Sequence, residues 1–353
     1  MITIGVDAHK RMHVALAVND AGQELGQWRG ANSAAGWRSV VQWADEMGCP
    51  RQWAIEGAWH YGRGLAQQLV AAGETVYEVS PRWTALGRRS ARKPGKTDRL
   101  DARVVALLAR QEASTLPLVV PEDESSVLAL LTSEREAALG EAARLGNQIH
   151  ALLMQLDPEY DGYLPNLRSK AGLDALESYA SPNGCLLQEQ RAAAVRRLAK
   201  RFRLALTQAK DLAGQIAAYA EARFSPLTRL CGVNLLTAGM LAGILGPGRR
   251  FSTDAELAAY AGVAPLETSS AGLTRHRLNR GGNRRLNAIL YRIALTQAHY
   301  SPEAKAYLER RVSEGKTRRE AIRALKRFIA RAVWRLWQEC ETSSTRLPVE
   351  KVA

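Results

Sequence analysis

The sequence predicts a protein of class α/β plus α, in which an α/β domain is followed by parts that are mostly helical. Two observations favour this class. Over the first 120 residues, short apolar strands alternate with helical stretches, which is typical of a sheet covered by helices. From about Ser125 onward, apolar residues instead recur at spacings of three and four, the period of long helices. We therefore expect three parts, at residues 1–120, 121–224 and 225–345.

The first part begins with β structure. The stretches ITIGVDAHK, HVALAVND and QELGQWRG each favour a strand, and residues 33–47 favour a helix. QWAIEGAWHYG then predicts a short buried strand, and ETVYEVSP predicts another that Pro81 ends. This β-β-β-α-β order is that of a sheet like the one in RNase H.

The second part, residues 121–224, carries a heptad pattern. Leu131, Ala138, Leu145 and Leu152 recur every seven residues. After a Pro- and Gly-rich loop at 157–184 the pattern returns more regularly, at Val195, Leu198, Phe202, Ala205, Ala209, Leu212, Ile216 and Tyr219. This spacing predicts a coiled-coil arm. Two alternatives stay open: an antiparallel hairpin closed within one chain, and a seam that also joins two chains.

The third part, residues 225–345, has two features of note. LCGVNLLTAGMLAGILG places Gly232 and Gly239 around a short apolar helix and resembles a helix-hairpin-helix turn, in which backbone amides hold a phosphate. Two glycines are, however, common in apolar helical stretches of any function. Further on, five arginines without an acid, from Arg275 to Arg285, precede another helix. Trp334 and Trp337 are three residues apart on a late helix, which favours a place in the core.

The charge indicates a polyanionic partner. The chain has a net charge of +14 and a pI near 9.9. Residues 82–110 hold nine Lys or Arg against two acids, and residues 271–340 hold seventeen against five. Such clustering favours a nucleic acid over a membrane surface, because neither cluster lies on an obvious apolar-faced helix.

Other features of the composition exclude several classes. There is no apolar run near the about 18 residues that a membrane span needs, and no signal-peptide pattern, so we expect a cytoplasmic protein. The four cysteines are scattered without a CxxC pair, which argues against a disulfide framework and a structural zinc site.

Four carboxylates occur where elements of the first domain end or begin. Asp7 closes the first strand and Glu56 the fourth, whereas Asp98 and Asp101 lie in the first turn of a helix with Thr97 as the predicted N-cap. Strand ends and nearby helix starts converge on one crevice in an α/β sheet, so the four side chains are expected to meet.

Carboxylates that converge would repel one another unless divalent cations neutralised them, and ligation by oxygen alone suits Mg²⁺ or Mn²⁺. Two such ions can stabilise the attacking and leaving oxygens of a phosphodiester. Each acid alone has a structural alternative, such as a favourable interaction with the helix dipole. His9 is interpreted as a strand-edge residue and not as a metal ligand.

Basic residues around these acids fit contacts to phosphates. The predicted nucleic-acid contacts are Arg88, Arg89, Arg92, Lys93, Lys96, Arg99, Arg275, Arg277, Arg280, Arg284 and Arg285. A solvated basic loop is the alternative for any one of them.

The motifs together resemble one family. GVDAHK, AIEGAWHYG and KTDRLDARVVALLAR resemble the N-terminal DEDD motifs of the insertion-sequence family IS one-ten, and YAGVAP, SSAG and RHRLNRGGNRRLN resemble its C-terminal transposase domain. The resemblance implies a RuvC-like domain, a coiled-coil arm and a mostly helical C-terminal domain. It also implies a nucleoid-associated, site-specific DNA recombinase that acts on donor and target DNA, guided by a structured bridge RNA, as a homodimer or homotetramer.

The resemblance also assigns roles to residues. The DEDD set corresponds to Asp7, Glu56, Asp98 and Asp101 as ligands of Mg²⁺ or Mn²⁺. A serine of the C-terminal domain would attack DNA and form a covalent phosphoserine. Where the family usually has a serine directly before a glycine, this chain reads Ser269-Ser270-Ala271-Gly272, so Ser270 is favoured and Ser269 is the second candidate. Activation of this serine at the carboxylate site requires the two domains to meet.

Three alternatives belong to other functional classes. One is a metal-dependent nuclease such as a junction resolvase, which would use the carboxylates without a serine. Another is an ASKHA-type kinase or ATPase, which needs Gly, Thr or Ser after its first aspartate, whereas here Ala8-His9-Lys10-Arg11 follows. The third is an architectural protein that binds nucleic acid with an inactive site.

Overall fold

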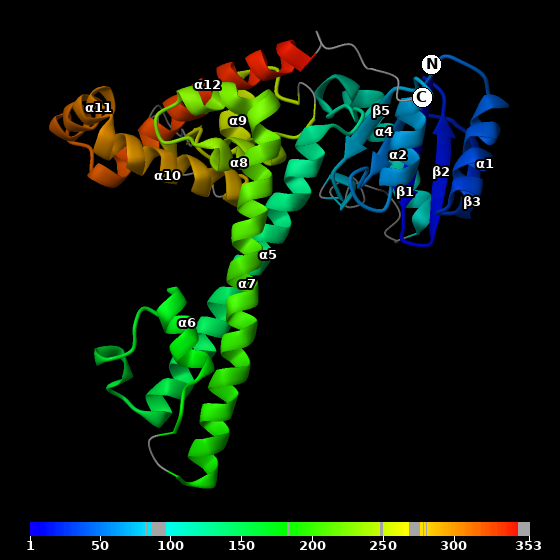
Figure 1. Cartoon of the computed structure of the whole chain (residues 1–353). Helices are drawn as coiled ribbons and strands as arrows, with labels where there is room; N and C mark the ends of the chain where they lie inside the picture. Colours follow the sequence, from blue (N-terminus) through cyan, green and yellow to red (C-terminus); the bar gives the residue numbers. More distant parts are fainter. Residues whose placement is uncertain are drawn as a thin grey trace. The chain divides into compact units, whose positions relative to one another are not determined.

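The computed structural model describes residues 1–81, 83–85, 97–181, 184–247, 250–267, 276–277, 279 and 281–344 (Figure 1). The chain divides into two compact units, Met1–Asp123 and Glu124–Ala353. Within the described ranges, no helix combines the length and the apolar character that crossing a membrane would require. The finer division at residues 120 and 224 stays a prediction.

The N-terminal unit is built on a mixed sheet. Its strands are β1 (Ile2–Ala8), β2 (Met12–Val18), β3 (Glu24–Ala31), β4 (Arg51–Glu56) and β5 (Val76–Val79), in the order β3-β2-β1-β4-β5. β1 pairs antiparallel with β2 and parallel with β4. The expected mixed α/β sheet is confirmed.

Helices cover both faces of this sheet. α1 (Ala34–Asp45) and α2 (Arg63–Ala71) pack on the face that carries Ile4 and Val6. α4 (Asp98–Glu112), which the 3₁₀ turn Ala113–Thr115 follows, packs on the opposite face against Leu16 and Ala54. Since side chains alternate between the faces of a strand, Asp7 and Glu56 lie on the face that α4 covers.

A glycine sets how closely α4 approaches β1. A Cβ atom on Gly5 would lie 2.2 Å from the carbonyl oxygen of Ala102 and 2.3 Å from the amide nitrogen of Ala106. No side chain fits in that space, so the helix backbone rests directly on the strand. Gly5 therefore lets α4 lie close to β1 at Ala102 and Ala106, directly after the turn that carries Asp98 and Asp101.

The second unit begins with a helical hairpin, α5 (Glu124–Leu156) and α7 (Leu186–Phe224) (Figure 1). Between them lie the 3₁₀ turn Tyr160–Gly162 and α6 (Lys170–Glu177). Ion pairs join Arg223 to Glu124 and Arg201 to Glu141, so residue numbers rise along one helix as they fall along the other. The helices are therefore antiparallel within one chain.

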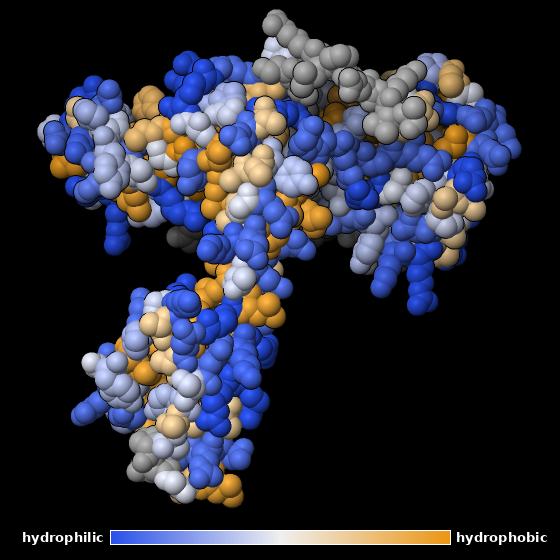
Figure 2. All heavy atoms as spheres, in the orientation of Figure 1, coloured by the Kyte–Doolittle hydropathy of each residue, from blue (hydrophilic) through white to orange (hydrophobic). Residues whose placement is uncertain are grey.

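The coiled coil itself, and a seam that joins two chains, stay predictions. One detail of the predicted seam is wrong: Tyr219 is 51% exposed, and Ala220 is buried instead. A straight helix of 3.6 residues per turn drifts away from a repeat of 3.5, which accounts for the shift. Figure 2 shows hydrophobic side chains scattered among hydrophilic ones along this hairpin.

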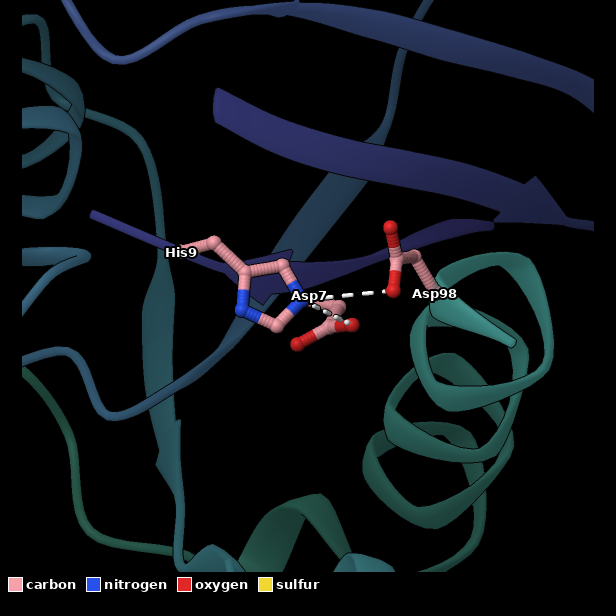
Figure 3. Close-up of side chains that lie close together, drawn as sticks. All are labelled: Asp7, His9 and Asp98. Atoms are coloured by element: carbon pink, nitrogen blue, oxygen red, sulfur yellow. Dashed lines mark ion pairs between the residues drawn. The ribbon is translucent and has the colours of Figure 1, made fainter. Parts of the chain in front are cut away.

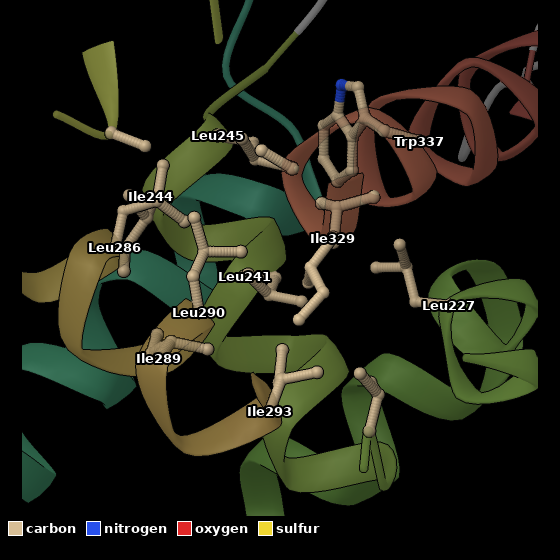
Figure 4. Packing of buried hydrophobic residues seen from close by; sticks show 14 of the residues in the cluster. Leu227, Leu241, Ile244, Leu245, Leu286, Ile289, Leu290, Ile293, Ile329 and Trp337 are labelled. Atoms are coloured by element: carbon tan, nitrogen blue, oxygen red, sulfur yellow. The ribbon is translucent and has the colours of Figure 1, made fainter. Parts of the chain in front are cut away.

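The remaining elements form a helical core. They are the 3₁₀ turn Ser225–Arg229, α8 (Leu235–Leu245), α9 (Asp254–Tyr260), the short strands β6 (Leu266–Glu267) and β7 (His276–Arg277), α10 (Arg284–Tyr300), α11 (Pro302–Ser313) and α12 (Arg318–Ser344). Leu241, Leu290, Ile293 and Trp337 meet in this core (Figure 4). Trp337 is buried and stacks on Phe224 with ring centroids 5.4 Å apart, which confirms it as a core residue. Trp334 is partly buried: it packs against this core, and its indole donates to the carbonyl of Phe251.

The glycines of α8 have a packing role. A Cβ on Gly239 would lie 2.5 Å from Cγ2 of Ile216, and one on Gly243 would lie 2.6 Å from the amide nitrogen of Ala129. Both glycines let α8 approach the hairpin closely. Packing therefore accounts for Gly239 without a phosphate.

Candidate active site

Asp7 and Glu56 are neighbours on adjacent strands. The parallel register of β1 and β4 sets their Cα atoms opposite each other, and both side chains lie on the face covered by α4. Asp7 is 4% exposed, whereas Glu56, the last residue of β4, is partly exposed. A buried carboxylate at the end of a central strand is costly unless it is paired, which marks Asp7 as a candidate functional group.

Asp98 and Asp101 open helix α4. The side chain of Thr97 accepts a hydrogen bond of 3.2 Å from the amide of Leu100, which confirms Thr97 as the N-cap. Asp101 is buried at 3% exposure, and Asp98 is partly exposed. The helix dipole favours acids at this terminus, so local structure places both carboxylates here without strain.

A cluster of three side chains joins the strand to the helix. Nε2 of His9 lies 3.1 Å from Oδ2 of Asp7 and 3.4 Å from Oδ1 of Asp98. One ligand atom from each residue falls within 4.8 Å of the others. Figure 3 shows the imidazole next to both carboxylates, with Asp98 on the first turn of the helix.

His9 was not among the expected ligands, although the sequence carries a signal for it. Residues two apart on a strand share one face, so a histidine two residues after Asp7 points to the same side. The turn that follows keeps it there, because the amide of His9 donates to the carbonyl of Met12 at 3.0 Å.

The electrostatics of the cluster favour a cation. Burial raises the pKa of Asp7 above its usual range, and the charges of Asp101 and Asp98 raise it further, while His9 lowers it. The free protein thus carries an unfavourable concentration of negative charge that a divalent cation would relieve. Carboxylate oxygens with one imidazole nitrogen suit Mn²⁺ and, with His9 held out of the coordination shell, Mg²⁺.

Four of the predicted nucleic-acid contacts lie in the described residues. Arg99 donates two hydrogen bonds to Glu24, at 2.8 and 2.9 Å, and Arg285 forms an ion pair with Glu136 at 2.8 Å. Arg284 is exposed at the start of α10, and Arg277 belongs to β7. Arg99 and Arg285 are each engaged in an ion pair within the protein. Of the two arginines at the start of α10, Arg284 is therefore the more available for contact with a phosphate.

The other predicted contacts and both candidate nucleophiles lie outside the described residues. They are Arg88, Arg89, Arg92, Lys93, Lys96, Arg275 and Arg280, together with Ser269 and Ser270. Their assignments stay predictions.

Comparison with a solved structure gives a weak likeness. RuvC from T. thermophilus, in complex with a Holliday junction substrate, aligns with 34% of this chain and 100% of that chain at 16% identity and a TM-score of 0.27. A likeness at this level carries no argument.

Comparison of sequences is decisive. Residues 4–158 match a transposase model of DEDD type, and residues 225–309 match the model of the transposase IS116/IS110/IS902 family. The 43.6 kDa protein of insertion element IS110 from Streptomyces coelicolor is 30% identical over 297 residues, which cover 72% of this chain and 73% of that protein. The 44.8 kDa protein of IS116 from Streptomyces clavuligerus is 26% identical and covers 100% of this chain and 98% of its own length. The chain described here belongs to the IS116/IS110/IS902 family of transposases.

Proposed function

We propose that this transposase is a site-specific DNA recombinase that cuts and rejoins DNA at the carboxylate cluster, with a serine as nucleophile and a structured RNA as guide. The observation that carries the proposal is the convergence of Asp7, His9 and Asp98, whose ligand atoms lie within 4.8 Å of one another. The buried Asp101 on the same helix and Glu56 in register with Asp7 complete the carboxylate set.

The carboxylates have the role of holding Mg²⁺ or Mn²⁺. Asp7, Glu56, Asp98 and Asp101 are the proposed ligands, and His9 is an additional candidate. A bound divalent cation would neutralise these acids and stabilise negative charge on the phosphoryl oxygens of DNA. Because the backbone of α4 packs directly against Gly5, the acids of the helix are held at a fixed distance from those of the strands.

Ser270 is the proposed nucleophile, with Ser269 as the second candidate. Its Oγ forms a bond to phosphorus while the bond from phosphorus to a deoxyribose oxygen breaks, and the hydroxyl proton ends on that leaving oxygen. A deoxyribose hydroxyl of another strand then attacks the phosphoserine, forms the new phosphodiester and returns the proton to serine. The number of phosphoester bonds is unchanged, so no external energy source is needed.

The charge of the chain is consistent with guidance by RNA. Clustered arginines and lysines contact phosphates without reading sequence, so specificity would reside in base pairing between the bridge RNA and DNA. Exchange between two duplexes needs several active sites, which is the reason to expect a homodimer or homotetramer.

The test is a recombination assay with purified protein, RNA transcribed from the flanks of its element, donor DNA, target DNA and Mg²⁺. We expect recombined DNA and a covalent protein–DNA adduct that require the RNA and the cation, and that disappear in a Ser270→Ala variant. Ser269→Ala is the matched control, because it removes the neighbouring hydroxyl and should retain activity if Ser270 is the nucleophile.

A second candidate function is a metal-dependent nuclease that hydrolyses junctions without a serine intermediate. The carboxylate cluster supports this nuclease as well as it supports the recombinase, because the described geometry of the cluster involves no serine. Cleavage without an adduct, retained in Ser270→Ala, would select this candidate over the recombinase.

A further inference from the structure

A basic cleft lies in the second unit, away from the carboxylate cluster in the chain. Its cavity of about 570 Å³ is bounded by the loop Gly262–Pro265, Asn279 and helices α11 and α12. This volume suits a ligand of the size of a nucleotide. Six of its lining side chains are cationic, namely Arg310, Arg311, Lys316, Arg323, Lys326 and Arg327.

The positive charge of the cleft is only partly compensated. Glu320, the acid among its described lining residues, accepts hydrogen bonds from the backbone and side chain of Thr317 and so caps helix α12. Arg327 pairs with Asp254, and Arg310 and Arg311 pair with Glu314. Over the described part of the chain, Lys316, Arg323 and Lys326 have no carboxylate within ion-pair distance.

Lys326 is the most informative of these cations. It is 7% exposed, and its Nζ donates to Oδ1 of Asn287 at 2.8 Å. The amide group of Asn287 in turn donates to the carbonyl of Ala261 at 2.8 Å, which fixes Oδ1 toward the lysine. Burial lowers the pKa of Lys326. Nζ also lies 5.8 Å from the centroid of the Tyr291 ring. One hydrogen-bond acceptor and one aromatic face compensate a buried ammonium group only in part, so an anion would lower the cost of burying it.

The backbone around the loop is packed so that the cleft keeps its form. A Cβ on Gly282 would lie 2.3 Å from the amide nitrogen of Gly262, and Gly262 has a φ of +67°. The side-chain amide of Asn279 donates to the carbonyl of Ala259. This wall of the cleft is therefore preformed. The close contact between Gly282 and Gly262 requires that residue 282 have no side chain.

An aromatic wall adjoins the cations. Tyr307 and Phe328 both line the cleft, with ring centroids 5.2 Å apart in an edge-to-face arrangement. Phe328 is 52% exposed although Tyr307 packs against it, so much of its ring faces solvent. Cations beside an exposed aromatic ring are the features with which proteins bind the phosphates and bases of single strands.

We propose that this cleft binds a single-stranded nucleic-acid segment, with a phosphodiester at Lys326 and Arg323 and a base against Phe328. The proposal rests on the proposed function, because it names where a nucleic-acid strand of that reaction is held. DNA and RNA share the phosphate and the base, so the test separates them.

The test measures binding of the full chain in EDTA to labelled single strands of oligothymidylate and oligouridylate of equal length, by fluorescence anisotropy. Removing a charge-assisted contact predicts that Lys326→Met and Arg323→Ala each weaken binding of one probe about ten- to a hundredfold. For each variant the slope of log K against log salt should fall by about 0.7. Lys305→Met removes an exposed lysine of α11 outside the cleft and is expected to change binding by less than about twofold.

A second readout locates the strand. Strands that carry 5-iodouracil should photocross-link to Phe328 or Tyr307, and Phe328→Leu should abolish the cross-link at residue 328. A larger effect on oligothymidylate supports the proposal with DNA as the ligand, and a larger effect on oligouridylate supports it with RNA. Equal weakening by Lys326→Met and Lys305→Met, or cross-links only outside α11 and α12, would overturn it.

Separate controls distinguish a loss of binding at the cleft from misfolding and from failure of the proposed recombinase. Lys326→Met removes a buried charge and should raise the melting temperature, whereas a lysine that served only to bind Asn287 would lower it. Ser270→Ala and Asp7→Asn should bind single strands in EDTA as the wild type does. Loss of recombination with normal binding therefore tests the carboxylates and serine, and loss of binding in the lysine variant tests the cleft.

Discussion

Nε2 of His9 lies 3.1 Å from Oδ2 of Asp7, and the same nitrogen lies 3.4 Å from Oδ1 of Asp98. One imidazole thus bridges a carboxylate at the end of a strand and a carboxylate at the start of a helix. In the free protein this contact offsets part of the repulsion between the acids. A bound cation would replace this contact. Metal binding at the cluster can therefore be measured as a change in the free energy of unfolding of the protein.

The first prediction concerns Asp7. Because burial and the neighbouring acids raise the pKa of Asp7, its ionised form destabilises the metal-free fold at neutral pH. We expect Asp7→Asn to be at least as stable as the wild type without metal. The wild type should gain about 1.4 kcal/mol when Mn²⁺ is tenfold above its Kd, and the variant should gain almost nothing.

Thermal unfolding with EDTA and with Mn²⁺ measures both effects. Glu46→Gln removes an exposed acid outside the cluster and should keep the full gain on adding Mn²⁺. An undiminished gain in Asp7→Asn would remove Asp7 from the metal site.

The second prediction separates nitrogen from oxygen ligation. An imidazole ligand strengthens binding of Mn²⁺ more than that of Mg²⁺. We expect His9→Ala to weaken Mn²⁺ binding about tenfold and Mg²⁺ binding much less. Calorimetric titration of both ions provides the measurement. Equal losses for the two ions would mean that His9 acts only as a neighbouring charge.

The third prediction tests the close contact of β1 and α4. Gly5→Ala places a methyl group 2.2 Å from the carbonyl oxygen of Ala102, so overpacking should cost about 1–3 kcal/mol of unfolding free energy and displace Asp98 and Asp101 from Asp7. Denaturant unfolding and Mn²⁺ titration give the two readouts.

Gly26→Ala is the matched control on β3, because its methyl group would meet the flexible end of Met47 at 3.3 Å. If both variants bind Mn²⁺ as tightly as the wild type, the distance between strand and helix does not govern the site.

The fourth prediction concerns the dependence of stability on pH. His13 on β2 is fully buried, and burial lowers its pKa from the ordinary value of 6.5. Below pH 6.5 the unfolded chain therefore binds a proton that the folded protein resists, so stability falls as the pH falls. The slope due to this group is at most about 1.4 kcal/mol per pH unit.

Denaturant unfolding between pH 8 and pH 5 should show this decline in the wild type and a smaller one in His13→Gln. Curves for the two proteins that run parallel across the range would show that another group is responsible.

The sequence predicts those features that depend on local pattern. Alternating apolar residues indicate the strands, and the Ser/Thr preference of helix starts identifies Thr97, whose cap the structure confirms. The assignment of Tyr219 to the buried seam is wrong, because a heptad pattern extended over four repeats does not follow the drift of a straight helix.

Features that depend on distant contacts were not predictable in the same way. The contact of Lys326 with Asn287 joins residues 39 apart in the chain. Asn287 ends the stretch RHRLNRGGNRRLN, but nothing in that stretch identifies Lys326 as its partner. Gly239 illustrates the same limit, because the Ile216 side chain that requires it lies on a different helix. His9 is a different case. Its spacing of two residues from Asp7 predicts that both side chains lie on one face, but the predicted set of metal ligands did not include it.

The most direct test of the proposed recombinase is the identity of the residue that bears the DNA. Trypsin cuts after Arg250 and Arg275, so both candidate serines fall in one peptide, residues 251–275. After reaction with guide RNA, DNA and Mg²⁺ and digestion of the DNA, mass spectrometry of this peptide should show a nucleotide on Ser270. The modification should be absent from Asp98→Asn and Ser270→Ala. DNA cleavage that leaves this peptide unmodified in the wild type would contradict the serine mechanism.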